Sequence, residues 1–190
     1  GGDLVVEDDR AISDLLRLYI SREGFGVHVA TDGLSALAAA RSIHPAAIVL
    51  DDANPAVIVP TAVGVCVHAG QACAATSRML IHRSLFDQAV ADITAAYQYV
   101  PVGDPVDPGT LVGPVISAAQ QNRVLTAIDD ARRDGAEITV GGGPLQGLPG
   151  HLADGHFVAP AVIVGVDNGA AIAQQEVFGP VLVVLPFEDD

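Results

Sequence analysis

The first fifty residues alternate between short apolar runs and segments in which apolar residues recur every three or four positions. The runs predict strands at 4–7, 27–30 and 47–50. The periodic segments predict helices at 9–23 and 33–43. This β-α-β-α-β order predicts three parallel strands joined by right-handed crossovers.

The rest of the chain repeats these two patterns. Two more strands are predicted at 78–82 and 136–140, and the continuous apolar runs at 161–164 and 181–185 are typical of strands covered on both faces. Helices are predicted at 60–66, 85–99 and 117–134, the last with Ser117 as its N-cap. We therefore predict one α/β domain over residues 1–190, with a doubly wound, mostly parallel sheet of the Rossmann or flavodoxin type.

Charge and composition narrow the choice of partners and compartment. The formal net charge of −14 repels phosphate backbones and anionic lipid, so we expect neither nucleic-acid nor membrane partners. No apolar run approaches the roughly 18 to 20 residues that span a bilayer, and no signal peptide is evident, so we expect a cytoplasmic protein. Only Cys66 and Cys73 are present, without metal-ligand spacing, which favours reduced thiols. All nine cationic side chains are arginine, and lysine is absent.

A cysteine motif occupies residues 70–78, with the sequence Gly-Gln-Ala-Cys-Ala-Ala-Thr-Ser-Arg. Further motifs follow it in order: Val-Gly-Asp-Pro at 102–105, Gly-Pro-Val-Ile-Ser at 113–117, Phe-Val-Ala-Pro-Ala at 157–161, and Gln-Glu-Val-Phe-Gly-Pro-Val at 175–181. Together these motifs make residues 46–190 resemble part of the catalytic domain of aldehyde dehydrogenases.

The resemblance implies roles for three residues. Cys73 would be the nucleophile that attacks an aldehyde carbonyl, and it needs the thiolate form, whose ordinary pKa is about 8.5. Glu176 would bind the nicotinamide ribose of NAD(P), and Phe178 would pack beside it. The family's general-base glutamate, oxyanion asparagine and adenosine-binding lysine belong to sequence that is absent here, so we expect an incomplete NAD(P) site. His68 also departs from the asparagine that is usual at its position.

Residues 1–44 resemble the amino-terminal half of a response-regulator receiver domain. This second resemblance rests on Leu-Val-Val-Glu-Asp-Asp at 4–9 and on Thr-Asp-Gly at 31–33. It implies that Glu7 and Asp8 bind Mg²⁺ weakly and that Asp51 is the phospho-acceptor, since hard oxygen ligands suit this ion. A receiver also needs a lysine, which the sequence lacks. Alternatively, these carboxylates are solvated acids at strand ends.

The two resemblances meet at the segment 46–52. We interpret the chain as an engineered or recombined chimera of a receiver-like segment, 1–45, and an aldehyde-dehydrogenase-like segment, 46–190, without native catalytic turnover. Two alternatives stay open: a residual NAD(P)-dependent aldehyde dehydrogenase or esterase that uses Cys73, and a receiver-like Mg²⁺-binding module. Uncovered sheet edges and apolar patches lead us to expect self-association, as a homo-oligomer or a swapped dimer.

Overall fold

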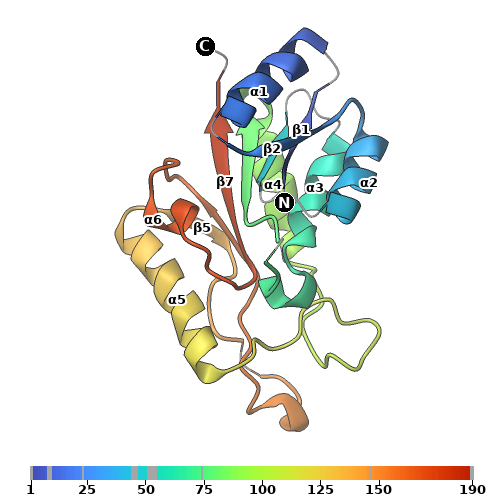
Figure 1. Ribbon diagram of the computed structural model, residues 1–190. Coiled ribbons are helices and arrows are strands. Elements are labelled where there is room, and N and C mark those ends of the chain that lie inside the picture. The colour runs from blue at the N-terminus through green and yellow to red at the C-terminus, as the bar shows by residue number, and fades with distance from the viewer. Residues whose placement is uncertain are drawn as a thin grey trace.

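One parallel sheet organises the molecule. The computed structural model describes residues 2–7, 10–22, 24–43, 47–50, 55–73, 75–145 and 147–188. Within these residues, a seven-stranded sheet has the order β2-β1-β3-β4-β7-β6-β5 (Figure 1). Its strands are β1 (Gly2–Val6), β2 (Gly26–Ala30), β3 (Ala47–Leu50), β4 (Arg78–His82), β5 (Glu137–Val140), β6 (Ala161–Val164) and β7 (Val181–Phe187). Only β5 runs antiparallel to its neighbour, so the prediction of a mostly parallel sheet is confirmed.

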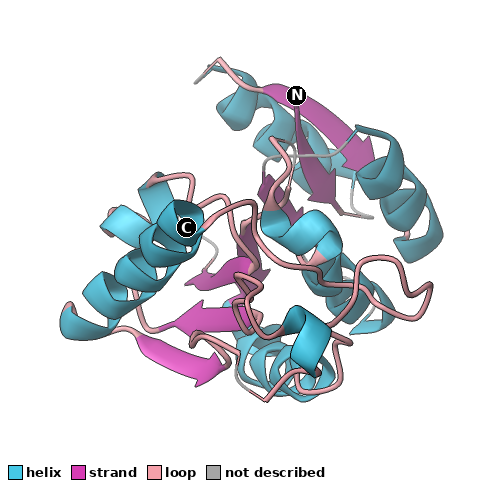
Figure 2. Cartoon of the chain, turned by 90° about the horizontal axis from the view of Figure 1, so that it is seen from below, coloured by secondary structure: helices cyan, strands magenta, loops and turns pink. Residues whose placement is uncertain are grey.

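Helices cover both faces of the sheet (Figure 2). They are α1 (Arg10–Arg22), α2 (Gly33–Ile43), α3 (Pro55–Gly64), α4 (Arg83–Tyr97), α5 (Ala118–Arg133) and α6 (Ala171–Gln174). The predicted N-cap of α5 is confirmed, because the Ser117 side chain accepts a hydrogen bond from the Gln120 N–H. In the part of the chain that the structure describes, no helix combines the length and the apolar character needed to cross a membrane.

The strand β7 shows why an unbroken apolar run suits the centre of this sheet. Leu182 and Val184 join the cluster under α2, α3 and α4, whereas Val181, Val183 and Leu185 join the cluster under α5 and α6. All five side chains are buried. Because successive side chains point to opposite faces, a strand with both faces covered needs an apolar residue at every position.

The helix predicted at 60–66 is wrong in its bounds. The helix begins earlier, with Pro55 at the first helical position that favours proline, and Pro60 lies inside α3. The helix ends at Gly64, and a 3₁₀ turn (Val67–Gly70) follows Cys66. A right-handed helix cannot continue there, because His68, Ala69 and Gly70 all have positive φ.

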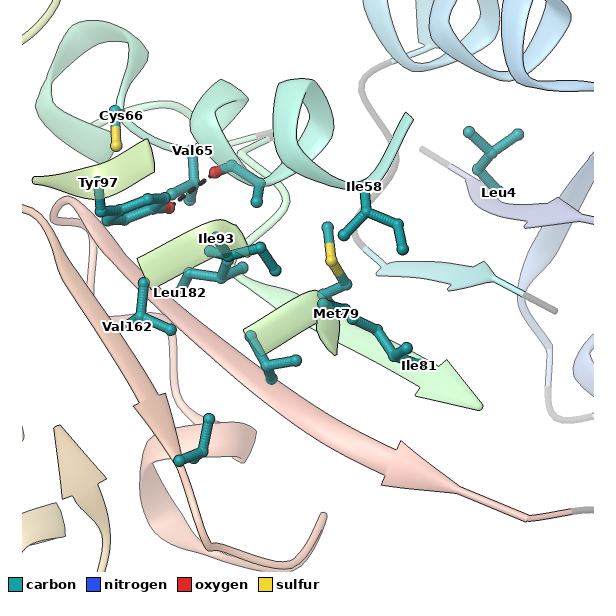
Figure 3. Packing of buried hydrophobic residues seen from close by; sticks show 14 of the residues in the cluster. Leu4, Ile58, Val65, Cys66, Met79, Ile81, Ile93, Tyr97, Val162 and Leu182 are labelled. Carbon is teal, nitrogen blue, oxygen red and sulfur yellow. Dashed lines mark hydrogen bonds between the residues drawn. The ribbon is translucent and has the colours of Figure 1, made fainter. Parts of the chain in front are cut away.

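A buried tyrosine joins α4 to α3 (Figure 3). The Tyr97 hydroxyl donates a hydrogen bond of 2.7 Å to the carbonyl of Ala62, in the last turn of α3. Tyr97 and Cys66 are both buried in the same cluster, which also includes Met79 of β4. The contact therefore fixes the end of α3, from which the chain enters the turn that precedes Cys73.

We expect Tyr97→Phe to lower the free energy of unfolding by about 1 to 2 kcal/mol, because the Ala62 carbonyl loses a buried donor. Tyr99→Phe is the matched control, since Tyr99 is 83% exposed. Urea unfolding followed by circular dichroism measures both variants. Equal stability of the two variants would contradict this role for Tyr97.

The helix α1 packs against β1 and β2 but leaves apolar side chains in solvent. Leu15, Leu18 and Tyr19 are 50%, 56% and 58% exposed, and Phe25, which follows the helix, is 59% exposed. An exposed apolar face of this kind is typical of contact surfaces. Self-association of the chain stays a prediction.

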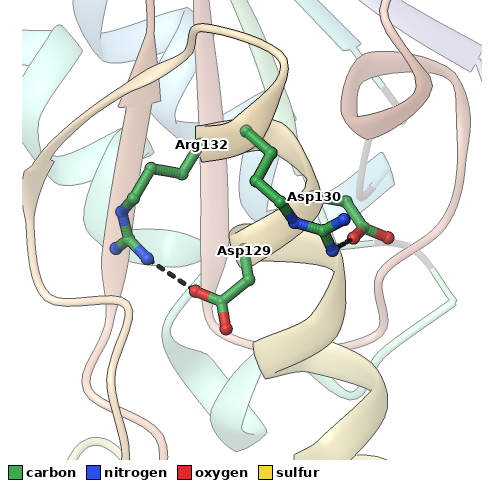
Figure 4. A network of polar contacts seen from close by, with 4 residues as sticks. Asp129, Asp130 and Arg132 are labelled. Carbon is green, nitrogen blue, oxygen red and sulfur yellow. Dashed lines mark hydrogen bonds and ion pairs between the residues drawn. The ribbon is translucent and has the colours of Figure 1, made fainter.

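The solvent face of α5 is charged, in contrast to its buried face. Arg132 pairs with Asp129, and Arg133 pairs with Asp130 (Figure 4). All four side chains are at least half exposed, so each pair contributes less than about 1 kcal/mol. The position of α5 therefore depends on its apolar face and on contacts at its amino end.

Candidate active site

Cys73 lies in the cysteine loop, residues 70–78, which leads from the 3₁₀ turn into β4. Its side chain is exposed. Because β4 begins at Arg78, the loop lies at the amino end of that strand. The other cysteine, Cys66, is fully buried, and burial raises its pKa to about 12, so it is a poor source of thiolate.

The turn before the cysteine loop has a left-handed backbone. His68, Ala69 and Gly70 have φ values of 54°, 55° and 70°. Asparagine and histidine are both enriched in this conformation, so His68 suits a position where the family usually has asparagine. Alanine is not favoured there, and at Ala69 the left-handed backbone costs about 1 to 2 kcal/mol.

Gly70 allows the cysteine loop to touch a second loop that is distant in sequence. A Cβ atom on Gly70 would lie 1.9 Å from the carbonyl oxygen of Gly179. Gly179 in turn faces α5, where its own Cβ would lie 2.5 Å from Cγ2 of Val124. The two loops therefore meet backbone to backbone at Gly70, and Gly179 packs against the Val124 side chain of α5. A side chain would not fit at either glycine.

The second loop, residues 168–179, is tied to β4 by an arginine. Arg78 Nη1 donates hydrogen bonds of 3.0 Å to the side chain of Asn168 and to the carbonyl of Ala173. Ala173 lies within α6, and Gln175 to Gly179 follow that helix. Arg78 thus links the end of the cysteine loop to the segment that carries Glu176.

Two glutamine side chains connect these loops to the amino end of α5. Gln71 accepts a hydrogen bond of 2.8 Å from the Ile116 N–H, and its own amide donates to the His68 carbonyl at 3.3 Å. Gln120 Nε2 donates to the carbonyls of Val177, at 3.1 Å, and Phe178, at 2.8 Å. The amino end of α5 is therefore the common support of both loops.

A cavity of about 250 Å³ lies between the two loops. Its lining includes Cys73, Glu176 and Phe178, the three residues to which the family resemblance gives roles, together with Arg78 and Gly179. The Glu176 side chain is exposed and Phe178 is partly buried. The structure thus brings together residues about one hundred positions apart, while the roles of these residues stay predictions.

The stretch that carries Glu176 also borders a second cavity. This cavity has a volume of about 270 Å³ and lies between α5 and α6, with Gln175, Glu176 and Val177 in its lining. Glu176 therefore lines both the cysteine cavity and this second cavity.

Of the three predicted metal ligands the structure describes only Glu7, which lies at the other end of the parallel strands. Glu7 follows the carboxyl end of β1, and its side chain is buried, with 2% exposure. Asp8 and Asp51 lie outside the described residues. The residues that the structure describes contain no group of three His, Cys, Asp or Glu able to hold a metal ion. The strands β1, β3 and β4 are parallel, Glu7 follows the carboxyl end of β1, and Cys73 precedes the amino end of β4. The two residues therefore lie at opposite ends of the strands and do not form one site.

Sequence reasoning did not find the two glutamines. Gln71 belongs to the cysteine motif, but nothing in that motif reveals its bond to Ile116. Gln120 is one of two consecutive glutamines in the first turn of a helix, where a glutamine is ordinarily solvated. Only the fold shows that it points at Val177 and Phe178.

Comparison with known proteins identifies the same family that the motifs indicated. The family model for aldehyde dehydrogenases matches residues 29–190. Aldehyde dehydrogenase citD of Monascus ruber is 37% identical over 144 residues, and a putative aldehyde dehydrogenase of Staphylococcus aureus is 37% identical over 143 residues. Each alignment covers 75% of this chain but only 28% and 30% of the relative, so the chain spans less than a third of these proteins.

Solved structures extend the similarity to nearly the whole chain. Betaine aldehyde dehydrogenase of Staphylococcus aureus, solved with NAD⁺, has a TM-score of 0.71 at 29% identity and covers 98% of this chain and 34% of its own. Mycobacterium tuberculosis aldehyde dehydrogenase, also solved with NAD⁺, has a TM-score of 0.69 at 31% identity and covers 99% of this chain and 36% of its own.

These matches bear on the interpretation of residues 1–44. The family model already begins at residue 29, and the structural matches include the segment before it. They give no support to a receiver segment or to a chimera. The Rossmann-like α/β fold, the order of the motifs and the family match lead to one conclusion: this chain belongs to the aldehyde dehydrogenase family.

Proposed function

We propose that this chain supplies the nucleophile side of an NAD(P)-dependent aldehyde dehydrogenase site, in which Cys73 bonds covalently to the carbonyl carbon of its substrate. One observation carries the proposal: Cys73, Glu176 and Phe178 line a single cavity although they come from two distant loops. A small aldehyde is the substrate class that this arrangement favours. Relatives solved with NAD⁺ support the same cofactor here.

The covalent step needs a thiolate and a stabilised oxyanion. The Cys73 sulfur would attack the carbonyl carbon, and the electron pair of the C=O bond would move to the oxygen. The backbone N–H of Cys73 would donate to that oxyanion, where charge appears only during the reaction. With an activated ester, the oxyanion would collapse and expel the leaving group as its alkoxide or phenolate, which leaves a thioester that water can hydrolyse.

The residues present fit the nicotinamide end of NAD(P). Glu176 offers an exposed carboxylate beside the cavity, able to accept hydrogen bonds from two ribose hydroxyls, and Phe178 offers an apolar wall. When bound, the cofactor supplies the hydride acceptor for aldehyde oxidation. The adenosine-binding lysine has no counterpart, because these 190 residues contain no lysine. Acyl transfer from an ester does not require the bound cofactor, so it tests the role of Cys73 more directly than aldehyde oxidation does.

We expect p-nitrophenyl acetate to acetylate the peptide that contains Cys73, and Cys73→Ala to slow p-nitrophenol release about tenfold or more. Cys66→Ala is the matched control, because it removes the other thiol, which is buried outside the cysteine loop. Absorbance at saturating ester, with peptide mapping by mass spectrometry, measures both effects. The same release rate in Cys73→Ala, or acetyl groups on other residues alone, would disprove the proposal.

Two other interpretations receive no support from the comparisons. A chimeric or engineered origin stays a prediction, and so does the division into segments 1–45 and 46–190. The receiver-like alternative, with Mg²⁺ and Asp51 as phospho-acceptor, likewise stays a prediction without a supporting match. The proposed function therefore rests on the cysteine cavity and, for its cofactor, on the relatives solved with NAD⁺.

A further inference from the structure

Gln120 makes two hydrogen bonds to one turn of the loop opposite Cys73. Its Nε2 donates to the Val177 carbonyl at 3.1 Å and to the Phe178 carbonyl at 2.8 Å. An amide group carries two hydrogens, so both carbonyls can be satisfied at once. A side chain of the same length without a donor would leave two adjacent carbonyl oxygens facing it.

The turn that Gln120 holds is one that the chain does not favour by itself. Phe178 has a φ of 56°, a left-handed conformation that is uncommon for a large side chain. Next to it, Gly179 packs against Val124, one helical turn after Gln120. The helix α5 therefore contacts this turn from two successive positions on one face, once through polar groups and once through apolar ones.

The same turn is a wall of the cysteine cavity. Glu176, Phe178 and Gly179 line the cavity opposite Cys73, and Gly179 also meets Gly70 of the cysteine loop. A shift of the Phe178 carbonyl would move this wall relative to the sulfur. The Gln120 side chain does not line the cavity, so it would act only through the residues that it holds.

We propose that Gln120 is a positioning residue that sets the distance between the wall at Glu176 to Gly179 and the Cys73 thiol. This proposal rests on the proposed function, because the wall that Gln120 holds is the one that would face the cofactor there. The amide holds both carbonyls in place and so maintains the left-handed backbone of Phe178. The cavity then stays wide enough to admit a small carbonyl compound beside Cys73.

The test compares two thiol reagents at Cys73. Iodoacetamide is small, and N-phenylmaleimide is bulky, so the ratio of their rate constants reports the width of the cavity. Peptide mapping assigns each reaction to Cys73. We expect Gln120→Met and Gln120→Glu, which keep the length but lose the donor, to change this ratio about fivefold or more, since small displacements near a reacting atom change rates strongly.

Two further variants separate positioning from stability. Gln120→Lys restores a donor of similar reach and should keep the ratio within about twofold of the parent. Gln121→Met is the matched control, because Gln121 Nε2 donates to the Phe157 carbonyl at 2.8 Å, outside the cavity lining, and its loss should leave the ratio unchanged. An unchanged ratio in Gln120→Met, or an equal change in Gln121→Met, would overturn the proposal.

This experiment does not depend on acyl transfer. If the reagent ratio responds to Gln120 while p-nitrophenyl acetate leaves Cys73 unmodified, the proposed function fails and the positioning role stands. If Cys73 is acetylated while the ratio is insensitive to Gln120, the proposed function stands and the positioning role fails.

Discussion

Replacement of Gly70 by alanine should destabilise the protein by about 2 to 5 kcal/mol, because the new methyl group adds a steric conflict to an unfavourable backbone conformation. The left-handed φ of 70° costs an alanine residue part of this energy. The rest comes from the contact with Gly179, whose carbonyl oxygen would lie 1.9 Å from the added Cβ. That neighbour is backbone, so no side chain can rotate away.

Gly64→Ala is the matched control for this change. Gly64 ends α3 a few residues earlier, its side-chain position is open, and a Cβ there meets no heavy atom within 4 Å. We expect Gly64→Ala to change stability by no more than about 1 kcal/mol. Urea unfolding measures the stability of both variants, and the rate of Cys73 alkylation reports whether the conformation of the cysteine loop has changed. Equal stability of the two variants would show that the loops do not meet at Gly70.

Alkaline pH should unfold the protein through the buried thiol of Cys66. Burial raises the pKa of Cys66 from 9.0 to about 12, so the folded protein keeps the neutral thiol where the unfolded chain has already lost the proton. Below pH 9 both states are protonated and the stabilising contribution is fully present. Between pH 9 and pH 12 it is lost at about 1.4 kcal/mol per pH unit, or about 4 kcal/mol in all.

The control variants isolate the contribution of this thiol. Cys66→Ala should flatten the fall in stability between pH 9 and pH 12, and Cys73→Ala, which removes an exposed thiol, should leave the fall in place. Burial also raises the pKa of Tyr97, which contributes in the same direction, so some slope will remain in Cys66→Ala. Urea unfolding at a series of pH values gives the slopes, and identical slopes in the parent and Cys66→Ala would refute the assignment.

The sequence patterns predicted the sheet better than they predicted the site. Apolar runs identified β4, β6 and β7, and the Ser117 cap marked the start of α5 correctly, because these signals are local. The bounds of α3 were harder to predict, because the helix continues through Pro60, a residue that ordinarily interrupts helices. The helix α1 shows another limit, because the apolar periodicity predicted the helix but not that Leu15 and Tyr19 would be exposed.

The candidate site depends on contacts that no local pattern contains. Family motifs named Cys73, Glu176 and Phe178, but they did not show that these residues share a cavity. The glycine pair, Gly70 and Gly179, and the bonds of Gln120 arise only when β4 and β7 lie side by side. A glycine or glutamine carries no mark in the sequence that distinguishes such a contact from an ordinary loop or solvent-exposed position.

The place of β7 in the sheet also determines when the site can form. It follows the other six strands of the described sheet in sequence, yet it pairs with both β4 and β6 in the interior of that sheet. Contacts between residues so far apart close large loops and form slowly. During synthesis, β4 and β6 lack their shared neighbour until residues 181–187 have left the ribosome. The thiol of Cys73 therefore leaves the ribosome long before residues 176–179, which form the opposite wall of its cavity.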